Sequence, residues 1–108
     1  MILFDQNICH LTFSHTDCSD VWKLYFPQMQ SFFDVGLKHY CAVNFADNHL
    51  PQHITPIVYD ESLTYPQRLL SCLEKLENYE FIFFDHEDMF LYNTPDYAVL
   101  ENYYRYMT

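Results

Sequence analysis

Short apolar segments typical of strands alternate along this chain with apolar positions at helical spacing. The predicted strands cover residues 8–13, 38–46, 54–59 and 81–84. The predicted helices begin at residues 19–20, 64–65 and 94–96. Because helices separate most of these strands, we predict a mostly parallel sheet with helices on both faces, a three-layer Rossmann-like α/β sandwich.

Local signals mark the ends and breaks of the predicted elements. Thr64-Tyr65-Pro66-Gln67 has the pattern of a capping box with Pro in the first helical turn. Thr94 is expected to cap the last helix, with Pro95 at its first position. Pro27 is expected to kink or restart the first helix. Pro56 is expected either to confine the third strand to an edge or to delay its start until Ile57.

The spacing of apolar residues also predicts which side chains face the core. On the first helix these are Trp22, Tyr25, Phe26, Met29, Phe32 and Phe33. On the second they are Leu69, Cys72, Leu73 and Leu76, and on the third Leu100, Tyr103, Tyr104 and Met107. The continuous apolar run at 81–84 predicts a strand buried on both faces. As the fourth strand it would form an edge that needs a partner chain or a further segment to cover it.

Composition limits the size and class of the protein. Its 108 residues suffice for one domain, at 1–108, with a single hydrophobic core. Half of the residues are hydrophobic and 19% are aromatic, which excludes a disordered chain. The formal charge of −10, with basic residues scattered singly, argues against binding to nucleic acid or to anionic membranes.

The chain gives no sign of a membrane span or a secretory origin. No apolar segment approaches the ~20 residues that cross a bilayer, and the first residues carry Asp5 where a signal peptide has Lys or Arg. We therefore expect a cytoplasmic protein. Its cysteines lack the spacing of a disulfide framework, so reduced and mostly buried thiols are expected.

Four residues near the N-terminus are of zinc-binding type: Cys9, His10, His15 and Cys18. Cys9 and His10 are consecutive in a predicted strand, so their side chains point to opposite faces of the sheet. This geometry argues against a shared zinc site.

An acidic cluster follows the fourth predicted strand. Asp85, Glu87 and Asp88 stand there with His86 between them. Ligands of open parallel sheets bind beyond the carboxyl ends of the strands, and Mg²⁺ or Mn²⁺ takes one or two carboxylates before water and phosphate oxygens complete its shell. The cluster predicts a site for Mn²⁺ or Mg²⁺, with a solvated acidic turn as the alternative.

Three segments resemble, in their order and spacing, the donor-binding half of GT-A type glycosyltransferases. They are the helical segment 65–73, the strand with its acids at 79–88, and the step Thr94-Pro95-Asp96. In that family a helix with an Arg near its start leads to a strand that ends in a D-x-D motif. The resemblance covers residues 8–108, with its specific part at 57–96, and implies a nucleotide-diphospho-sugar transferase.

The resemblance also assigns roles to individual residues. Asp85 and Glu87 occupy the positions of the D-x-D acids, and Asp88 that of the acid that often follows. The family normally has Asp where Glu87 stands. In such enzymes a Mn²⁺ or Mg²⁺ ion joins these carboxylates to the donor diphosphate.

Three further positions correspond to the nucleotide-binding region of the family. Arg68 would lie near the donor, while Ser14 and Asp47, at the ends of the first two strands, match the region that holds base and ribose. The residues alone leave another role for Arg68, which could pair with Asp60, Glu61 or another surface acid.

The resemblance implies a nucleotide-sugar donor and a glycan, lipid or protein acceptor, whose identity and catalytic residues it does not define. The chain would hold the donor-binding half of such an enzyme, incomplete at its C-terminus or completed as a homo-oligomer. Two other functions remain open: a non-catalytic acidic α/β interaction domain, and a small acidic inhibitor or nucleic-acid mimic that the net charge would favour.

Overall fold

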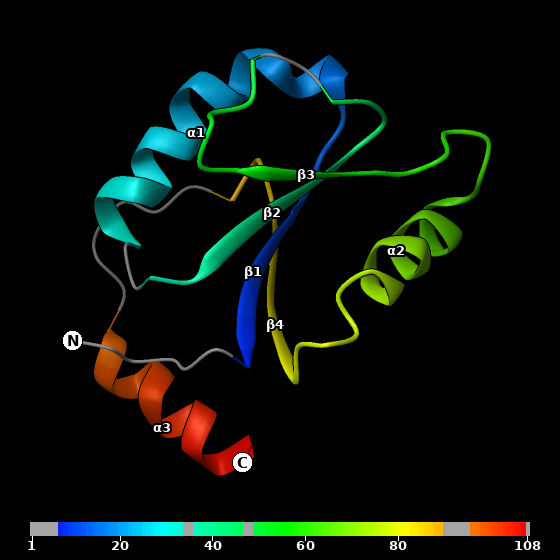
Figure 1. Cartoon of the computed structure of the whole chain (residues 1–108). Coiled ribbons are helices and arrows are strands. Elements are labelled where there is room, and N and C mark those ends of the chain that lie inside the picture. The colour runs from blue at the N-terminus through cyan, green and yellow to red at the C-terminus, as the bar shows by residue number, and fades with distance from the viewer. Residues whose placement is uncertain (1–6, 34–35, 47–48, 90–95, 108) are drawn as a thin grey trace.

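Four parallel strands form one sheet in the computed structural model, which describes residues 7–33, 36–46, 49–89 and 96–107 (Figure 1). The strands are β1 (Ile8–Phe13), β2 (Lys38–Val43), β3 (Thr55–Val58) and β4 (Phe81–His86). The helices are α1 (Ser19–Phe32), preceded by the short 3₁₀ turn η1 (Thr16–Cys18), α2 (Tyr65–Glu74) and α3 (Tyr97–Met107). This order confirms the predicted succession of strands and helices.

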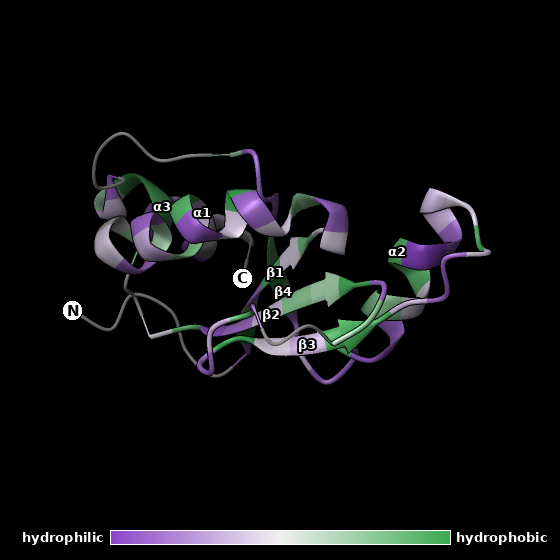
Figure 2. Ribbon diagram, turned by 90° about the horizontal axis from the view of Figure 1, so that it is seen from above, coloured by the Kyte–Doolittle hydropathy of each residue, from purple (hydrophilic) through white to green (hydrophobic). Residues whose placement is uncertain are grey.

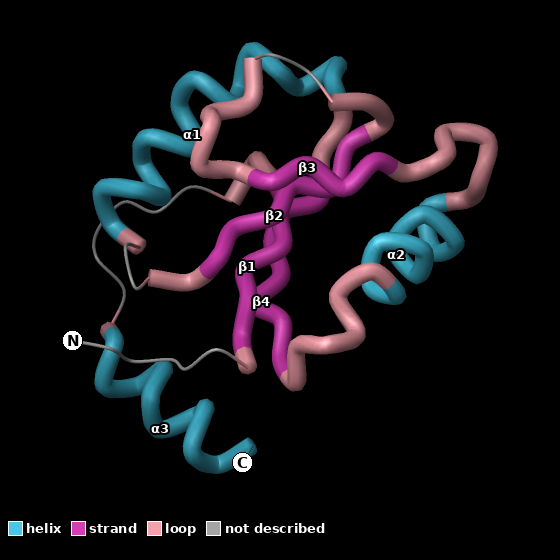
Figure 3. The backbone as a smooth tube through the Cα atoms, viewed as in Figure 1, coloured by secondary structure: helices cyan, strands magenta, loops and turns pink. Residues whose placement is uncertain are grey.

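The sheet has the strand order β3-β2-β1-β4 (Figure 3). Every neighbouring pair of strands is parallel. Side chains alternate along each strand between the two faces. Cys9 and Leu11 join Cys72 and Leu76 in the core beneath α2. The other face carries the core of α1, and Tyr97 and Leu100 of α3 pack against it. Figure 2 shows α1 and α3 on one side of the sheet and α2 on the other, so the predicted three-layer architecture is confirmed.

Helix α1 continues through Pro27 as one helix, so the prediction that Pro27 restarts it is wrong. The apolar stripe explains why the helix persists. Trp22, Tyr25, Phe26 and Met29 are all buried against the sheet. Burial of large aromatic side chains contributes about 1.5–3 kcal/mol each, which offsets the cost of about 3 kcal/mol for Pro inside a helix.

The second and third strands are shorter than predicted. β2 ends at Val43, and Phe45 beyond it is 53% exposed rather than aligned with the core. β3 forms an edge of the sheet, as Pro56 predicted, because Pro cannot donate a hydrogen bond to a further strand. It begins at Thr55, so the alternative start at Ile57 is wrong.

Strand β4 corrects two predictions. It continues past the apolar run through Asp85 and His86, because these residues pair with Thr12 and Phe13 of β1. It is also not buried on both faces, since its edge position leaves Phe84 38% exposed. Asp85 therefore belongs to the strand itself and not to the turn after it.

The start and the inward face of α3 also differ from the prediction. The carboxylate of Asp96 accepts hydrogen bonds from the backbone N–H groups of Ala98 and Val99, so Asp96 is the capping side chain. Thr94 and Pro95 lie outside the described residues. Tyr103, predicted to face the core, is 64% exposed. The side chains of Tyr104 and Met107 are outside the described part of the chain.

The capping box at the start of α2 is confirmed. Thr64 accepts from the backbone N–H of Gln67, and the Gln67 side chain accepts from the backbone N–H of Thr64. We expect Thr64→Ala to lower the free energy of unfolding by about 1 kcal/mol, because a first-turn N–H loses its acceptor. Urea unfolding measures this loss. Thr64→Ser, which keeps the hydroxyl, should restore most of it, and equal effects of the two substitutions would contradict the capping role.

Candidate functional site

The carboxyl ends of β1 and β4 lie side by side at the point where the strand order reverses, because the chain connections run outward from there in opposite directions. The connection from β1 leads through α1 to β2 on one side, whereas β3 leads through α2 to β4 on the other side of β1. Open α/β sheets bind their ligands in the crevice that such a reversal creates. Residues 14–16 follow β1 at this edge, and Glu87 and Asp88 follow β4.

Asp85 lies just inside this edge as the centre of a buried hydrogen-bond network. One oxygen, Oδ1, accepts from Thr12 Oγ1 at 2.7 Å and contacts His10 Nε2 at 3.0 Å. The other oxygen accepts from the Tyr25 hydroxyl of α1. Burial and the nearby carboxylate of Asp85 raise the pKa of Tyr25, so its hydroxyl stays protonated and donates. The network joins β1, β4 and α1.

The three predicted metal-binding carboxylates are not brought together as one set. Both oxygens of Asp85 are occupied by buried donors, and the residue is only 4% exposed. In the described residues no group of three or more His, Cys, Asp or Glu side chains is arranged to hold a metal ion. A cage that includes Asp85 does not fit this geometry.

Glu87 and Asp88 stand in the turn beyond β4. Asp88 is exposed, and Glu87 is half-buried. The Cys18 thiol donates to the Glu87 carboxylate, and this hydrogen bond, with burial second, raises the pKa of Cys18 to about 11. Cys18 is therefore a neutral thiol at physiological pH. Two adjacent carboxylates are a donor set that suits Mg²⁺ or Mn²⁺ when phosphate and water oxygens supply the other ligands.

The residues predicted to hold the nucleotide lie in different places. Ser14 is buried, and its hydroxyl accepts from Trp22 Nε1 at 2.9 Å, so this oxygen braces α1 against β1. Tyr59 donates to the backbone carbonyl of Ser14 at 2.6 Å. Asp47 lies outside the described residues.

Arg68 holds the loop between β3 and α2. Its Nε donates to the carbonyl of Leu63 at 2.8 Å, a second nitrogen donates to the carbonyl of Glu61, and the guanidinium lies 5.3 Å from the centre of the Tyr59 ring. Its hydrogen bonds thus go to backbone carbonyls, whereas the sequence suggested the carboxylates of Asp60 or Glu61. This arrangement fixes the start of α2 at the same edge of the sheet.

A second polar network, which the sequence did not indicate, joins the loops after β1, β2 and β3. His15 Nε2 lies 2.9 Å from Glu61 Oε2, and Asn44 donates to Glu61 Oε1 at 3.0 Å. The side chain of Asn44 also accepts from the backbone N–H of Thr16 at 2.8 Å. The hydrogen bonds from His15 and then Asn44 lower the pKa of Glu61. These contacts form one wall of the crevice edge.

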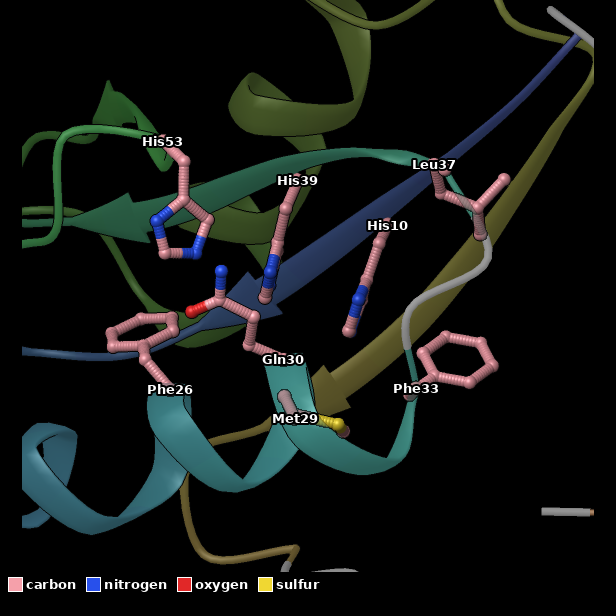
Figure 4. Close-up of a pocket in the computed structure, with 9 residues that line it drawn as sticks. His10, Phe26, Met29, Gln30, Phe33, Leu37, His39 and His53 are labelled. Carbon is pink, nitrogen blue, oxygen red and sulfur yellow. The ribbon is translucent and has the colours of Figure 1, made fainter. Parts of the chain in front are cut away.

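A cavity of about 150 Å³ lies between α1 and the sheet, beside the Asp85 network (Figure 4). Its walls consist of His10, Phe26, Met29, Gln30, Phe33, Gly36, Leu37, His39 and His53. His10 and His39 are directly paired on β1 and β2, and their rings stack at 3.8 Å between centroids. Figure 4 shows these rings and that of His53 facing Gln30 and Met29 of α1.

His39 makes the stability of the protein dependent on pH. Burial, and to a lesser extent the charges of His10 and His53, lower the pKa of His39 from 6.5 to about 2. His39 therefore binds a proton near pH 6.5 in the unfolded chain, whereas in the folded protein it stays neutral at that pH. Stability is full above that pH, and we expect it to fall by up to about 1.4 kcal/mol per pH unit below it.

The substitution His39→Gln isolates this effect, because the amide can still donate to Thr12 but does not titrate. We expect urea unfolding of this variant to show a weaker loss of stability than the natural protein between about pH 6.5 and about pH 5. His49→Gln, at an exposed position, is the control and should keep the full slope. An unchanged slope in His39→Gln would contradict the burial of a neutral imidazole.

Comparison of the chain with protein-family models, with curated proteins and with solved structures finds no match. The α/β fold with its parallel sheet is observed directly in the structure. Among the described residues, no helix combines the length and the apolar character that crossing a membrane requires.

Proposed function

We propose that this protein is a glycosyltransferase-like domain that binds a nucleotide-sugar donor, together with a divalent cation, at the carboxyl ends of β1 and β4. The observation that carries the proposal is the reversal of strand order between β1 and β4, with Glu87 and Asp88 directly after the carboxyl end of β4. The resemblance of segment 57–96 to the donor-binding half of GT-A enzymes supports the same edge.

The charge of the protein supports a role for a cation. A chain with a formal charge of −10 repels a diphosphate, and the guanidinium of Arg68, the basic side chain predicted for the donor, donates to backbone carbonyls. Glu87 and Asp88 would hold the cation, and Mn²⁺ or Mg²⁺ bound there would neutralise charge on the nucleoside diphosphate.

Asp85 has a different part in this proposal. Its contacts to Thr12 and Tyr25 fix the end of β4 against β1 and α1, so the backbone that carries Glu87 and Asp88 starts from a rigid position. Asp85 is thus a positioning residue. The loops tied together by Glu61 and Asn44 close the neighbouring wall, against which a base or ribose would rest.

A thermal-shift titration of the whole chain with UDP, GDP and their sugars, in Mn²⁺ or in EDTA, tests the proposal. We expect one nucleotide to raise the melting temperature by about 10 °C at a hundredfold excess over Kd, only with Mn²⁺. Glu87→Gln combined with Asp88→Asn should abolish the rise, while Glu77→Gln, an exposed acid on the turn after α2, should keep it.

Absence of any rise, from a chain that melts cooperatively, would refute donor binding. That result would favour the alternative of a non-catalytic interaction domain, for which exposed apolar side chains such as Phe45, at 53%, and Tyr106, at 92%, offer contact surface. The proposed transfer of the sugar to an acceptor depends on donor binding, so the same result would also refute the transfer.

A further inference from the structure

The cavity beside His10 and His39 lies apart from the crevice at the ends of β1 and β4. His10 and His39 are in the middle of β1 and at the start of β2, and Phe33, Gly36 and Leu37 line the cavity from the connection before β2. It therefore opens toward the amino end of β2, whereas Glu87 and Asp88 follow the carboxyl end of β4.

The hydrogen bonds around Asp85 define the tautomer of His39. Thr12 has a single hydroxyl proton, which it donates to Asp85. Its oxygen must therefore accept from His39 Nε2, which lies 2.7 Å away. Because burial keeps His39 neutral at physiological pH, the other ring nitrogen, Nδ1, carries a free lone pair.

This lone pair faces the cavity. The two nitrogens of an imidazole flank Cε1 and their bonding directions diverge widely, so an Nε2 bonded to Thr12 directs Nδ1 away from the Asp85 network. In the described part of the chain no fully buried side-chain nitrogen or oxygen lacks a hydrogen-bond partner. Since His39 Nδ1 makes no hydrogen bond to these residues, it is open to the cavity that His39 lines.

The stacked rings exclude a shared metal ion as the ligand. His10 and His39 are parallel within 6° and their centroids are 3.8 Å apart. A metal would have to lie in the plane of each ring at about 2.0–2.1 Å from its nitrogen, which two parallel planes at this separation do not allow. Phe26, Met29, Phe33 and Leu37 form the apolar part of the remaining wall, and Gln30 and His53 form its polar part.

We propose that this cavity binds a small molecule with a single aromatic or heteroaromatic ring that donates an O–H or N–H to Nδ1 of His39. A cavity of about 150 Å³ is large enough for benzene, and the cavity here has that volume, with both apolar and polar side chains on its wall. The ring would pack between Phe26, Phe33 and Met29, and the hydrogen-bond donor would reach the half-buried imidazole of His39.

Phenol and toluene are matched probes, because they have nearly the same shape and only phenol donates a hydrogen bond. We expect phenol to bind the natural protein about three- to tenfold more tightly than toluene, the net effect of one hydrogen bond. Phenol should also shift the ¹⁵N resonance of His39 Nδ1 in a long-range proton–nitrogen spectrum, and toluene should leave that resonance in place.

Two tryptophan variants on α1 locate the site. Gln30 is exposed at the cavity wall, so Gln30→Trp should block the cavity without disturbing the core and should weaken phenol binding at least tenfold. Leu24→Trp, at a position 68% exposed and not on the cavity wall, should leave binding unchanged. Equal affinity for the two probes, or phenol binding that survives Gln30→Trp, would overturn the proposal.

Discussion

Replacing Asp85 by alanine is expected to lower the free energy of unfolding by about 3–5 kcal/mol, because it leaves buried hydrogen-bond donors without the carboxylate that accepts from them. The hydroxyls of Thr12 and Tyr25 and the ring of His10 would all lose the carboxylate as acceptor, and the two hydroxyls would keep only their mutual contact at 2.9 Å in its place. These groups are too deeply buried for water to replace the carboxylate easily. Urea unfolding followed by the fluorescence of Trp22, the single Trp of the chain, measures the loss.

Asp88→Ala provides the matched control for this experiment. Asp88 is exposed, and removing a surface carboxylate changes stability by no more than about 0.5 kcal/mol. If Asp85→Ala were as mild as Asp88→Ala, Asp85 would be a solvated acid of the strand end. Its assignment as the centre of a buried network would then fail.

Trp22→Ala should lower the free energy of unfolding by a similar amount, about 3–5 kcal/mol, because it removes the largest buried side chain of α1 and leaves a cavity. Trp22 is 2% exposed and packs with Phe26 and the strand residues beneath it. Its indole N–H also donates to Ser14, so the substitution removes the brace between α1 and the end of β1. Far-UV circular dichroism follows unfolding of this variant, which lacks the fluorophore.

Two comparisons separate packing from the hydrogen bond at this position. Trp22→Phe keeps an aromatic ring but cannot donate to Ser14, so its loss should fall between zero and that of Trp22→Ala. Leu24→Ala, at a position 68% exposed on the same helix, should cost less than about 0.5 kcal/mol. A small effect of Trp22→Ala would place α1 away from the sheet.

The fold could be predicted because its signals are local. Apolar spacing defined α1, and the capping box defined the start of α2 at Tyr65. The errors occurred where distant residues decide the structure. The strand at 81–84 extends to His86 because β1 supplies hydrogen-bonding partners about seventy positions earlier in the chain, and no feature near Asp85 reports that pairing.

The candidate site was less predictable for the same reason. Asp85 has the appearance of a metal ligand in sequence, since its donors Thr12 and Tyr25 lie far away in the chain. The cavity was missed altogether. The sequence held one signal for it. His10 and His39 occupy strand positions on the sheet face that packs against α1, where the neighbouring residues are buried and apolar. Polar side chains in such positions need hydrogen-bond partners.

The most direct test of the proposed function is a calorimetric titration of the whole chain with UDP and with GDP in saturating Mn²⁺. We expect one nucleotide to bind with a stoichiometry of one per chain and EDTA to abolish the binding. We also expect Glu87→Gln with Asp88→Asn to remove the binding and Glu77→Gln to preserve it. Binding that persists in the double variant, or its absence from the folded natural protein, would contradict a donor site at the ends of β1 and β4.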